Sequence, residues 1–175
     1  MGAWDSRSLG PKHLAADLKY EPQRTYNYQL NIFGLPGQGT EQIMLTVVNF
    51  SLPNEQNEVI EIKHGNTNVK FAGSVTWQGS DTLTVIDYVT VDMSMIISDW
   101  RKLVYRQQSD EIGWAAEYKK AGQVVEVGPD GTFHRTWQYE GLWPSAVNYG
   151  ALDHENTNDV RRIEITMQYD RAYRI

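Results

Sequence analysis

The amino-acid sequence alternates between apolar and polar positions in several stretches, which predicts a protein built mainly of β-strands. Residues 25–33 and 160–169 each place every second side chain on one apolar face, as a half-buried strand does. Residues 82–91 show the same alternation, with Asp87 as the exception on the apolar face. Residues 42–50 are apolar on both faces, which predicts a strand that is covered on both sides.

The period of the pattern changes after Asp92, which is a favoured helix N-cap residue. Apolar residues then recur at helical spacing at Met93, Ile96, Ile97, Trp100 and Val104. This spacing predicts a helix from Met93 to about Gln107, with its apolar stripe against the core. Strands, one helix and further strands in that order indicate an antiparallel β protein rather than alternating βα units.

Turn residues predict two β-hairpins. The turn 128–131, with its Asp-Gly pair, separates strand-like residues 123–127 and 132–140. Gly65-Asn66 separates two further short strands in a hairpin of about 58–72. Its polar residues are Glu58, Glu61, Lys63, His64, Asn66 and Lys70. Because a hairpin this polar gains little from packing, it is either a solvated flap or a pairing partner for another chain.

The stretch 137–152 (WQYEGLWPSAVNYGAL) combines a strand pattern with a break at Gly141. We expect an uncharged loop over 142–152, with Trp143-Pro144 as the hinge between two strands. A large aromatic residue in front of a proline is suited to anchor a contact. We therefore hypothesise that a neighbouring subunit is contacted by Trp143, Pro144, Tyr149 and Leu152.

Composition limits the function classes. A chain of 175 residues is long enough for one domain with a core, and we expect an N-terminal arm (1–24) followed by a single domain (25–175). The net charge of −6 disfavours tight binding to nucleic acid. The chain has no cysteine, which excludes disulfides and thiolate chemistry. It also lacks an apolar run long enough to span a membrane and a secretory signal pattern, so we expect folding in a reducing cytoplasm.

No catalytic, cofactor-binding or metal-binding residues are expected. The four histidines, at positions 13, 64, 134 and 154, match no metal-binding or nucleophile motif. Asp153-His154-Glu155 is a His–carboxylate cluster in a polar bend, and a solvated turn explains it better than an active site. The chain is therefore predicted not to be an enzyme.

Several segments together resemble the tail tube proteins of contractile-tailed bacteriophages. In the C-terminal half, residues 118–122, the turn 128–131 and RTWQYEGLWPS at 135–145 precede the strand 162–169 in the order seen in that family. Residues 65–85 and the opening strand 26–33 provide two further matches. The resemblance covers about residues 25–170.

The resemblance implies an antiparallel β-sandwich or barrel of two packed sheets with one flanking helix (about 93–107) and an extended hairpin (about 58–72). It further implies hexameric rings that stack into a hollow tube, with sheath, baseplate and tail-terminator proteins as partners and no membrane. DNA would pass through the lumen without specific binding, and the hairpin residues named above would contribute to the inner barrel. Such a tube belongs to the virion tail and is assembled in the host cytoplasm.

Three alternatives remain open from the sequence. The tube could belong to a phage-tail-like bacteriocin or to a type VI secretion-like injection machine, whose tube subunits are related. A β-barrel binding module would instead place Trp77, Trp137 and Trp143 around one cavity. An enzyme would require chemistry around Asp153 and His154.

Overall fold

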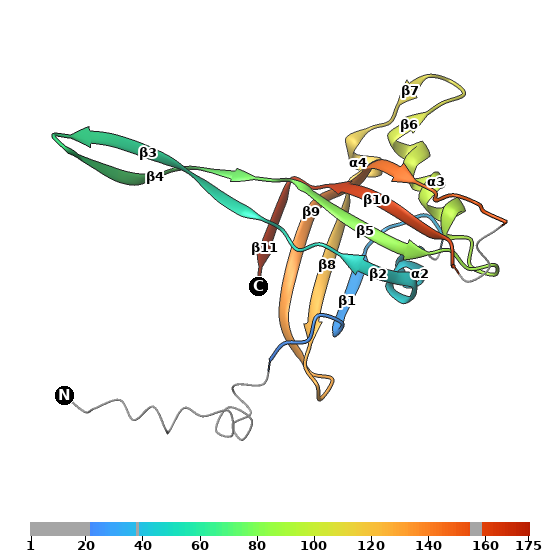
Figure 1. The fold of residues 1–175 in the computed structure, drawn as a ribbon. Coiled ribbons are helices and arrows are strands. Elements are labelled where there is room, and N and C mark those ends of the chain that lie inside the picture. Colours follow the sequence, from blue (N-terminus) through green and yellow to red (C-terminus); the bar gives the residue numbers. More distant parts are fainter. Residues whose placement is uncertain (1–21, 38, 155–158) are drawn as a thin grey trace.

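The computed structural model describes residues 22–37, 39–154 and 159–175, which form an antiparallel β body with a long projecting hairpin (Figure 1). Most of the expected N-terminal arm lies outside the described residues. The helices are α2 (Gly39–Thr46), α3 (Met93–Val104) and α4 (Ala115–Tyr118). The strands are β1 (Tyr28–Ile32), β2 (Val47–Phe50), β3 (Glu55–His64), β4 (Thr67–Trp77), β5 (Ser80–Ile86), β6 (Tyr105–Arg106), β7 (Glu111–Ile112), β8 (Lys120–Val127), β9 (Phe133–Asn148), β10 (Arg162–Gln168) and β11 (Arg171–Arg174).

The long strand β9 belongs to two sheets. Its first half pairs with β8 and β11, and its second half pairs with β10. The strand order is β1-β8-β9-β10-β5-β2, with β11 on β9. The direction changes at Gly141, where φ is +69° and a Cβ atom would lie 2.2 Å from Asp170 Oδ2. Glycine is required here because other residues rarely adopt this φ and any side chain would collide with Asp170.

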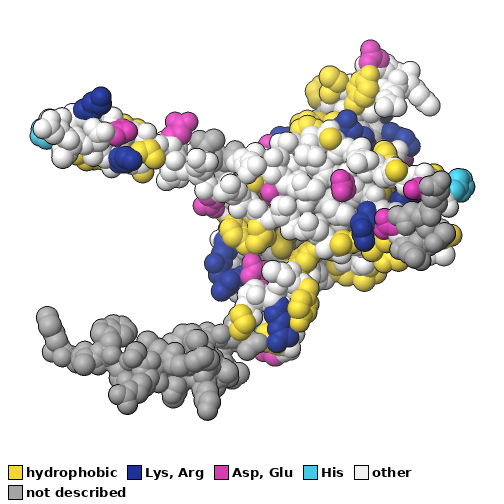
Figure 2. Space-filling model, viewed as in Figure 1, with side chains coloured by type: hydrophobic (Ala, Val, Ile, Leu, Met, Phe, Trp, Pro, Cys, Tyr) yellow, Lys and Arg dark blue, Asp and Glu magenta, His cyan; other side chains and the backbone are white. Residues whose placement is uncertain are grey.

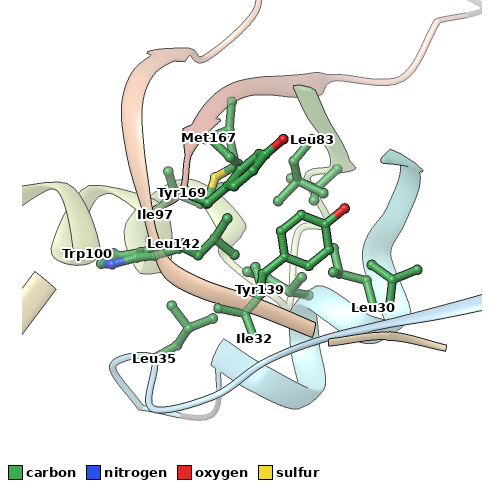
Figure 3. Close-up of a cluster of buried hydrophobic side chains, with 14 of the residues drawn as sticks. Leu30, Ile32, Leu35, Leu83, Ile97, Trp100, Tyr139, Leu142, Met167 and Tyr169 are labelled. Carbon is green, nitrogen blue, oxygen red and sulfur yellow. The ribbon is translucent and has the colours of Figure 1, made fainter. Parts of the chain in front are cut away.

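The strands surround a common core of buried side chains (Figure 3). The Tyr139 ring in β9 makes edge-to-face contacts with Phe50 at 5.4 Å and with Tyr169 at 5.3 Å between ring centroids. The fully buried side chains include Leu30, Ile32, Ile43, Leu83, Met93, Ile97, Trp100, Leu142, Ile163, Ile165 and Met167. The expected antiparallel β fold is therefore confirmed, with most strands joined in one large sheet. The barrel is not closed, because the terminal strands β1 and β2 do not pair with each other.

The expected strand over residues 42–50 is wrong for most of its length. Residues 39–46 form helix α2, and only Val47–Phe50 form a strand. Ile43 and Thr46 point into the body, and Thr46 Oγ1 donates to the carbonyl of Gln42 at 2.7 Å. A short apolar run fits a buried helix as well as a buried strand, so periodicity alone could not distinguish them.

The expected strand over residues 82–91 is too long. Strand β5 ends at Ile86, and Val89 is fully exposed. Asp87 breaks the apolar pattern because its carboxylate accepts a hydrogen bond from the Met93 amide at 3.1 Å and pairs with Arg161 at 3.2 Å. Helix α3 follows, with the expected cap: the Asp92 side chain accepts from the Met95 amide at 2.8 Å. The helix ends at Val104, three residues before the expected Gln107.

The uncharged loop expected from residue 142 is replaced by strand as far as Asn148. Pro144 is tolerated within β9 because the β9–β10 register is irregular there: Met167 faces Pro144 while Thr166 faces Ala146. Such a bulge is one of the few places in a sheet where proline fits. Trp143-Pro144 therefore lies inside one strand, next to a bulge at Ser145, and is not a hinge between two strands.

Candidate assembly surface

Strands β3 and β4 form the projecting hairpin (Glu55–Trp77), which extends away from the body (Figure 1). Among the described strands, these two pair only with each other, so both outer edges of the ribbon are open, and charged and hydrophobic side chains are visible along the projection (Figure 2). Every residue of β3 is exposed. At about 3.3 Å per residue, its 10 residues span roughly 33 Å. The expected hairpin of about 58–72 is thus confirmed, and it is longer than expected.

The projecting hairpin has two different faces, because residues paired across strands share a side. Its apolar face consists of the pairs Ile60–Phe71 and Ile62–Val69, whose side chains are 43% to 54% exposed. Its charged face carries the pairs Glu61–Lys70 and Lys63–Asn68, with Val59–Ala72 nearer the body. The sequence-based description of a polar hairpin is therefore incomplete, since an uncovered apolar surface lies on its other side.

The remaining hairpin residues predicted for the inner barrel have local roles. Glu58 lies opposite a register irregularity and accepts from Ser74 Oγ at 3.0 Å. A Cβ atom at Gly73 would lie 3.0 Å from the Glu58 carbonyl, so the glycine permits this close approach. The tip turn is Gly65-Asn66, with φ of +63° at Gly65, and the Thr67 hydroxyl donates to the His64 carbonyl at 3.0 Å.

A short neck connects the hairpin to the body, because β2 leads into β3 and β4 leads into β5. On one side, the Ser51 amide donates to the Thr82 carbonyl at 3.2 Å; on the other, Gly79 has φ of +63°. The Asn54 and Gln78 side chains are hydrogen-bonded across the neck at 3.4 Å. The hairpin is therefore an extension of the β2–β5 pair rather than a separate flap.

A buried polar cluster lies where the neck joins the core. Asp81, at a core-facing position of β5, is only 6% exposed, and burial raises the pKa of its carboxyl to about 6. Burial, and to a lesser extent the negative charge of Asp81, raises the pKa of Tyr169 to about 12. The same two causes also raise the pKa of Tyr139. Within the described residues, Asp81 Oδ2 and both phenol oxygens have no hydrogen-bond partner within 3.5 Å. In the sequence, this cluster is marked by Asp81, which takes a position on the apolar face of the strand pattern, two residues before Leu83.

The four residues hypothesised to contact a neighbouring subunit differ in burial. Leu152 is 88% exposed, whereas Pro144 is buried. Trp143 is half-buried and meets the Tyr118 ring edge-on at 5.7 Å between centroids. Tyr149 packs against the core from its rim. The structure of the single subunit does not bring these four together as one exposed patch, and their contact with a neighbour stays a prediction.

The described part of the chain contains no group of three or more His, Asp or Glu side chains arranged to hold a metal ion. Asp153 and His154 lie at the edge of a segment outside the description, which includes Glu155. No helix in the described ranges has the length and apolar character needed to cross a membrane.

Comparison with known proteins identifies the relatives of this chain. No protein-family model matches it. The tail tube protein gp19 of Enterobacteria phage T4 is 29% identical over 122 residues, which are 69% of this chain and 74% of the relative. The corresponding protein of Enterobacteria phage T6 gives the same figures. The chain is a homologue of gp19 of these two phages. These homologues are structural proteins and not enzymes, in agreement with the sequence-based prediction.

Solved structures show that this tail tube homologue also shares its fold with contractile injection systems. A chain of the anti-feeding prophage tube-terminating cap matches with a TM-score of 0.65 and 16% identity, covering 89% of this chain and 91% of that one. A chain of the PVC sheath–tube complex, from an extracellular contractile injection system, matches with a TM-score of 0.62 and 16% identity, covering 95% and 97%.

Proposed function

We propose that this chain is the tube subunit of a contractile phage tail, in which six copies close into a ring and rings stack into a hollow tube that conducts DNA. Homology to gp19 supports the assignment of the chain as a tail tube subunit. The projecting hairpin supports assembly, because it carries an apolar face and two open edges that nothing in the described chain covers. This uncovered hairpin is the observation on which the proposal depends most.

The physical argument is that a solitary hairpin of this kind is poorly stabilised. A two-stranded ribbon is marginal in water, and open strand edges invite pairing with other chains. Neighbouring subunits that pair with β3 and β4 and cover Ile60, Ile62, Val69 and Phe71 remove both problems. The opposite face, with Glu61, Lys63 and Lys70, is then the one that faces the lumen.

Charge is consistent with conduction of DNA rather than binding. The charged face carries both signs, with Glu61 directly opposite Lys70. The whole chain has a net charge of −6. Since affinity for DNA depends on unpaired cations that displace counterions, such a lumen gives DNA little to bind.

Partners follow from the same proposal. Chains of this fold occur in the PVC sheath–tube complex, in the PVC sheath/tube terminator and in the anti-feeding prophage baseplate, which was solved with six-fold symmetrisation. We propose sheath, terminator and baseplate contacts for this chain, with assembly in the host cytoplasm and residence in the virion tail. Trp143, Pro144, Tyr149 and Leu152 remain a proposed contact within the ring.

The test is electron microscopy and sedimentation of the full-length chain. We expect rings or tubes, and we expect Ile62→Lys to abolish them because it places a charge in the covered apolar face. Val89→Lys is the matched control, since Val89 is an exposed valine in the loop after β5. A wild-type chain that stays monomeric at all concentrations contradicts the proposal, as does normal tube formation by Ile62→Lys.

A tube from a bacteriocin or another injection machine is the second candidate, favoured by the fold shared with the PVC and anti-feeding prophage chains. Imaging the native particle separates the two, because only a phage tail is joined to a DNA-filled head. The ligand-binding alternative has no comparable support: neither Trp137 nor Trp143 lines the groove beside β1 and β2 or the groove beside α3, and the Trp77 side chain lies outside the described part of the structure.

A further inference from the structure

Besides the projecting hairpin, a second apolar projection lies at the C-terminal end of helix α3. Strands β6 and β7 form a small hairpin after the helix, and the chain then passes through Gly113 to α4 (Figure 1). Ile112 is 82% exposed and Trp114 is 79% exposed. We call this pair of side chains the knob.

Hydrogen bonds fix the backbone on both sides of the knob. The Gly113 amide donates to the Val104 carbonyl at 3.0 Å, and a Cβ atom at Gly113 would lie 1.8 Å from the Leu103 carbonyl oxygen. On the other side of the knob, the Trp114 carbonyl accepts from the Glu117 amide at 2.9 Å, and the Trp100 indole donates to the Tyr118 carbonyl at 2.8 Å. A backbone that is already fixed loses little entropy on binding, and tryptophan is one of the residue types enriched at binding hot spots.

A groove of about 780 Å³ lies between the terminal strands β1 and β2, where the barrel fails to close. Its apolar lining includes Tyr26, Met44, Val48, Phe50 and Leu52. This volume is within the usual range for sites that bury a compact organic group, and it exceeds the size of an indole ring.

The groove also contains an unsatisfied polar atom. Tyr28 lines the groove, and its hydroxyl is buried and has no hydrogen-bond partner in the part of the chain that the structure describes. A buried polar group usually has a partner. A tryptophan that enters the groove adds an apolar ring next to Phe50 and Leu52 and carries one N–H donor.

We infer that the knob of one subunit fills the β1–β2 groove of a neighbouring copy of the same chain. The knob cannot reach the groove of its own subunit, because β6–β7 and β1–β2 lie on opposite sides of the body (Figure 1). A knob and a groove on different surfaces make a head-to-tail contact, which is the type that generates rings and stacks. The inference rests on the proposed self-assembly and adds a contact that does not involve the projecting hairpin.

The acidic residues around the knob fit this direction of docking. Asp110 and Glu117 are exposed beside Ile112 and Trp114, while Glu111 is paired with Arg106 at 3.7 Å. Arg24 lies at the groove, where its guanidinium donates to the Tyr26 hydroxyl at 3.0 Å. The one carboxylate of the groove, Glu126, is paired with Arg135 at 3.6 Å.

Site-directed cross-linking tests the contact, because the natural chain has no cysteine. Full-length chains carrying Ala115→Cys, an exposed position beside Trp114, are mixed with chains carrying Val48→Cys, assembled and oxidised. We expect a disulfide-linked dimer from the mixture and little from either variant alone. Ile62→Cys replaces Ala115→Cys in the control mixture and should give no cross-link to Val48→Cys. Equal cross-linking in the control mixture, or none in the test mixture, overturns the inference.

A second measurement compares side chains. Trp114→Ser should raise the concentration needed for assembly roughly 30-fold or more, as expected for a hot-spot tryptophan. Val89→Ser, at another exposed apolar position, should leave it unchanged. If electron microscopy shows tubes but Trp114→Ser has no effect, the knob–groove contact is wrong and the proposed function stands. If no variant and no wild-type sample assembles, the proposed function fails together with the contact.

Discussion

The two long β-hairpins of this chain each form around a glycine-containing turn, but one is packed within the subunit and the other is exposed. The β8–β9 hairpin packs one face on the core through Val124, Tyr139 and Leu142, and its neighbours β1 and β10 pair with its edges. Among the described strands, the projecting hairpin pairs with no other strand, and it leaves its apolar face exposed. The first hairpin is thus completed within the subunit, whereas the second is completed only in the assembly that we propose. Substitutions should therefore affect folding in one region and assembly in the other.

The largest contrast is expected between Leu142→Ala and Phe71→Ala. Leu142 is fully buried in β9, and its truncation should lower the free energy of unfolding of the subunit by about 2–5 kcal/mol. Phe71 lies on the exposed apolar face, so its truncation should change subunit stability by less than about 0.5 kcal/mol and still reduce tube formation. Denaturant unfolding of unassembled protein and sedimentation measure the two effects. A large loss of subunit stability in Phe71→Ala would show that the hairpin is not independent of the body.

Asp81, at the junction of the two regions, should make the stability of the subunit depend on pH. Burial raises its folded-state pKa from 3.8 to about 6, so the folded state binds the proton more tightly than the unfolded state. Stability from this group is therefore greatest below about pH 4 and falls as the pH rises to about 6. The total change is about 3 kcal/mol at about 1.4 kcal/mol per pKa unit.

Measurement of unfolding free energy across this pH range in wild type and Asp81→Asn isolates the effect. The asparagine variant should lack the decline that Asp81 contributes. If the two pH profiles coincide, the carboxyl group is solvated in the subunit and its burial has been misjudged.

The backbone conformations of the two regions can be compared at Gly141 and Gly65. Both have positive φ, but a side chain at Gly141 would collide with Asp170, whereas nothing lies within 4 Å of one at Gly65. We expect Gly65→Ala to cost about 1 kcal/mol or less and Gly141→Ala to cost about 1–3 kcal/mol in the free energy of unfolding. The double variant Gly141→Ala with Asp170→Ala should recover the part that is due to collision. Equal costs at the two glycines would mean that the bend of β9 can relax.

The smallest effect is expected from exposed charge pairs. Lys119 Nζ lies 2.8 Å from Asp170, with both side chains partly exposed, so Asp170→Asn should change subunit stability by at most about 1 kcal/mol. Exchanging the paired charges with Glu61→Lys and Lys70→Glu should leave the subunit unchanged while preserving the pairing across the hairpin. A tube assay with this double variant shows whether the position of each charge matters to the neighbours.

The sequence predicted those elements whose pattern has one physical explanation. The Asp92 cap and the apolar stripe after it located α3, and the turns at Gly65-Asn66 and 128–131 located both hairpins. Residues 42–50 failed because an apolar run on both faces does not specify its period, and residues 142–148 failed because Trp-Pro was taken as a break where a bulge accommodates it. The knob was missed, since nothing local distinguishes an exposed tryptophan in a connector from a buried one.

The candidate assembly surface was predicted in part. The charged face of the hairpin could be recognised from residue types, but the apolar face depends on the cross-strand register and on the shift at Gly73, which tertiary pairing determines. The groove lies between two strands about 20 residues apart in sequence that do not pair, so no sequence pattern marks it.

The continuity of the hairpin with β5 has a mechanical consequence. A pull along the hairpin axis passes through the covalent chain into β5, which is antiparallel to β10 over the register from Ser80–Gln168 to Ile86–Arg162. Such a force acts parallel to the strands, so it shears all of these backbone hydrogen bonds together instead of opening them one after another. In the tube that we propose, a neighbouring subunit that pulls on the hairpin along its axis would therefore meet the strongest resistance of the sheet.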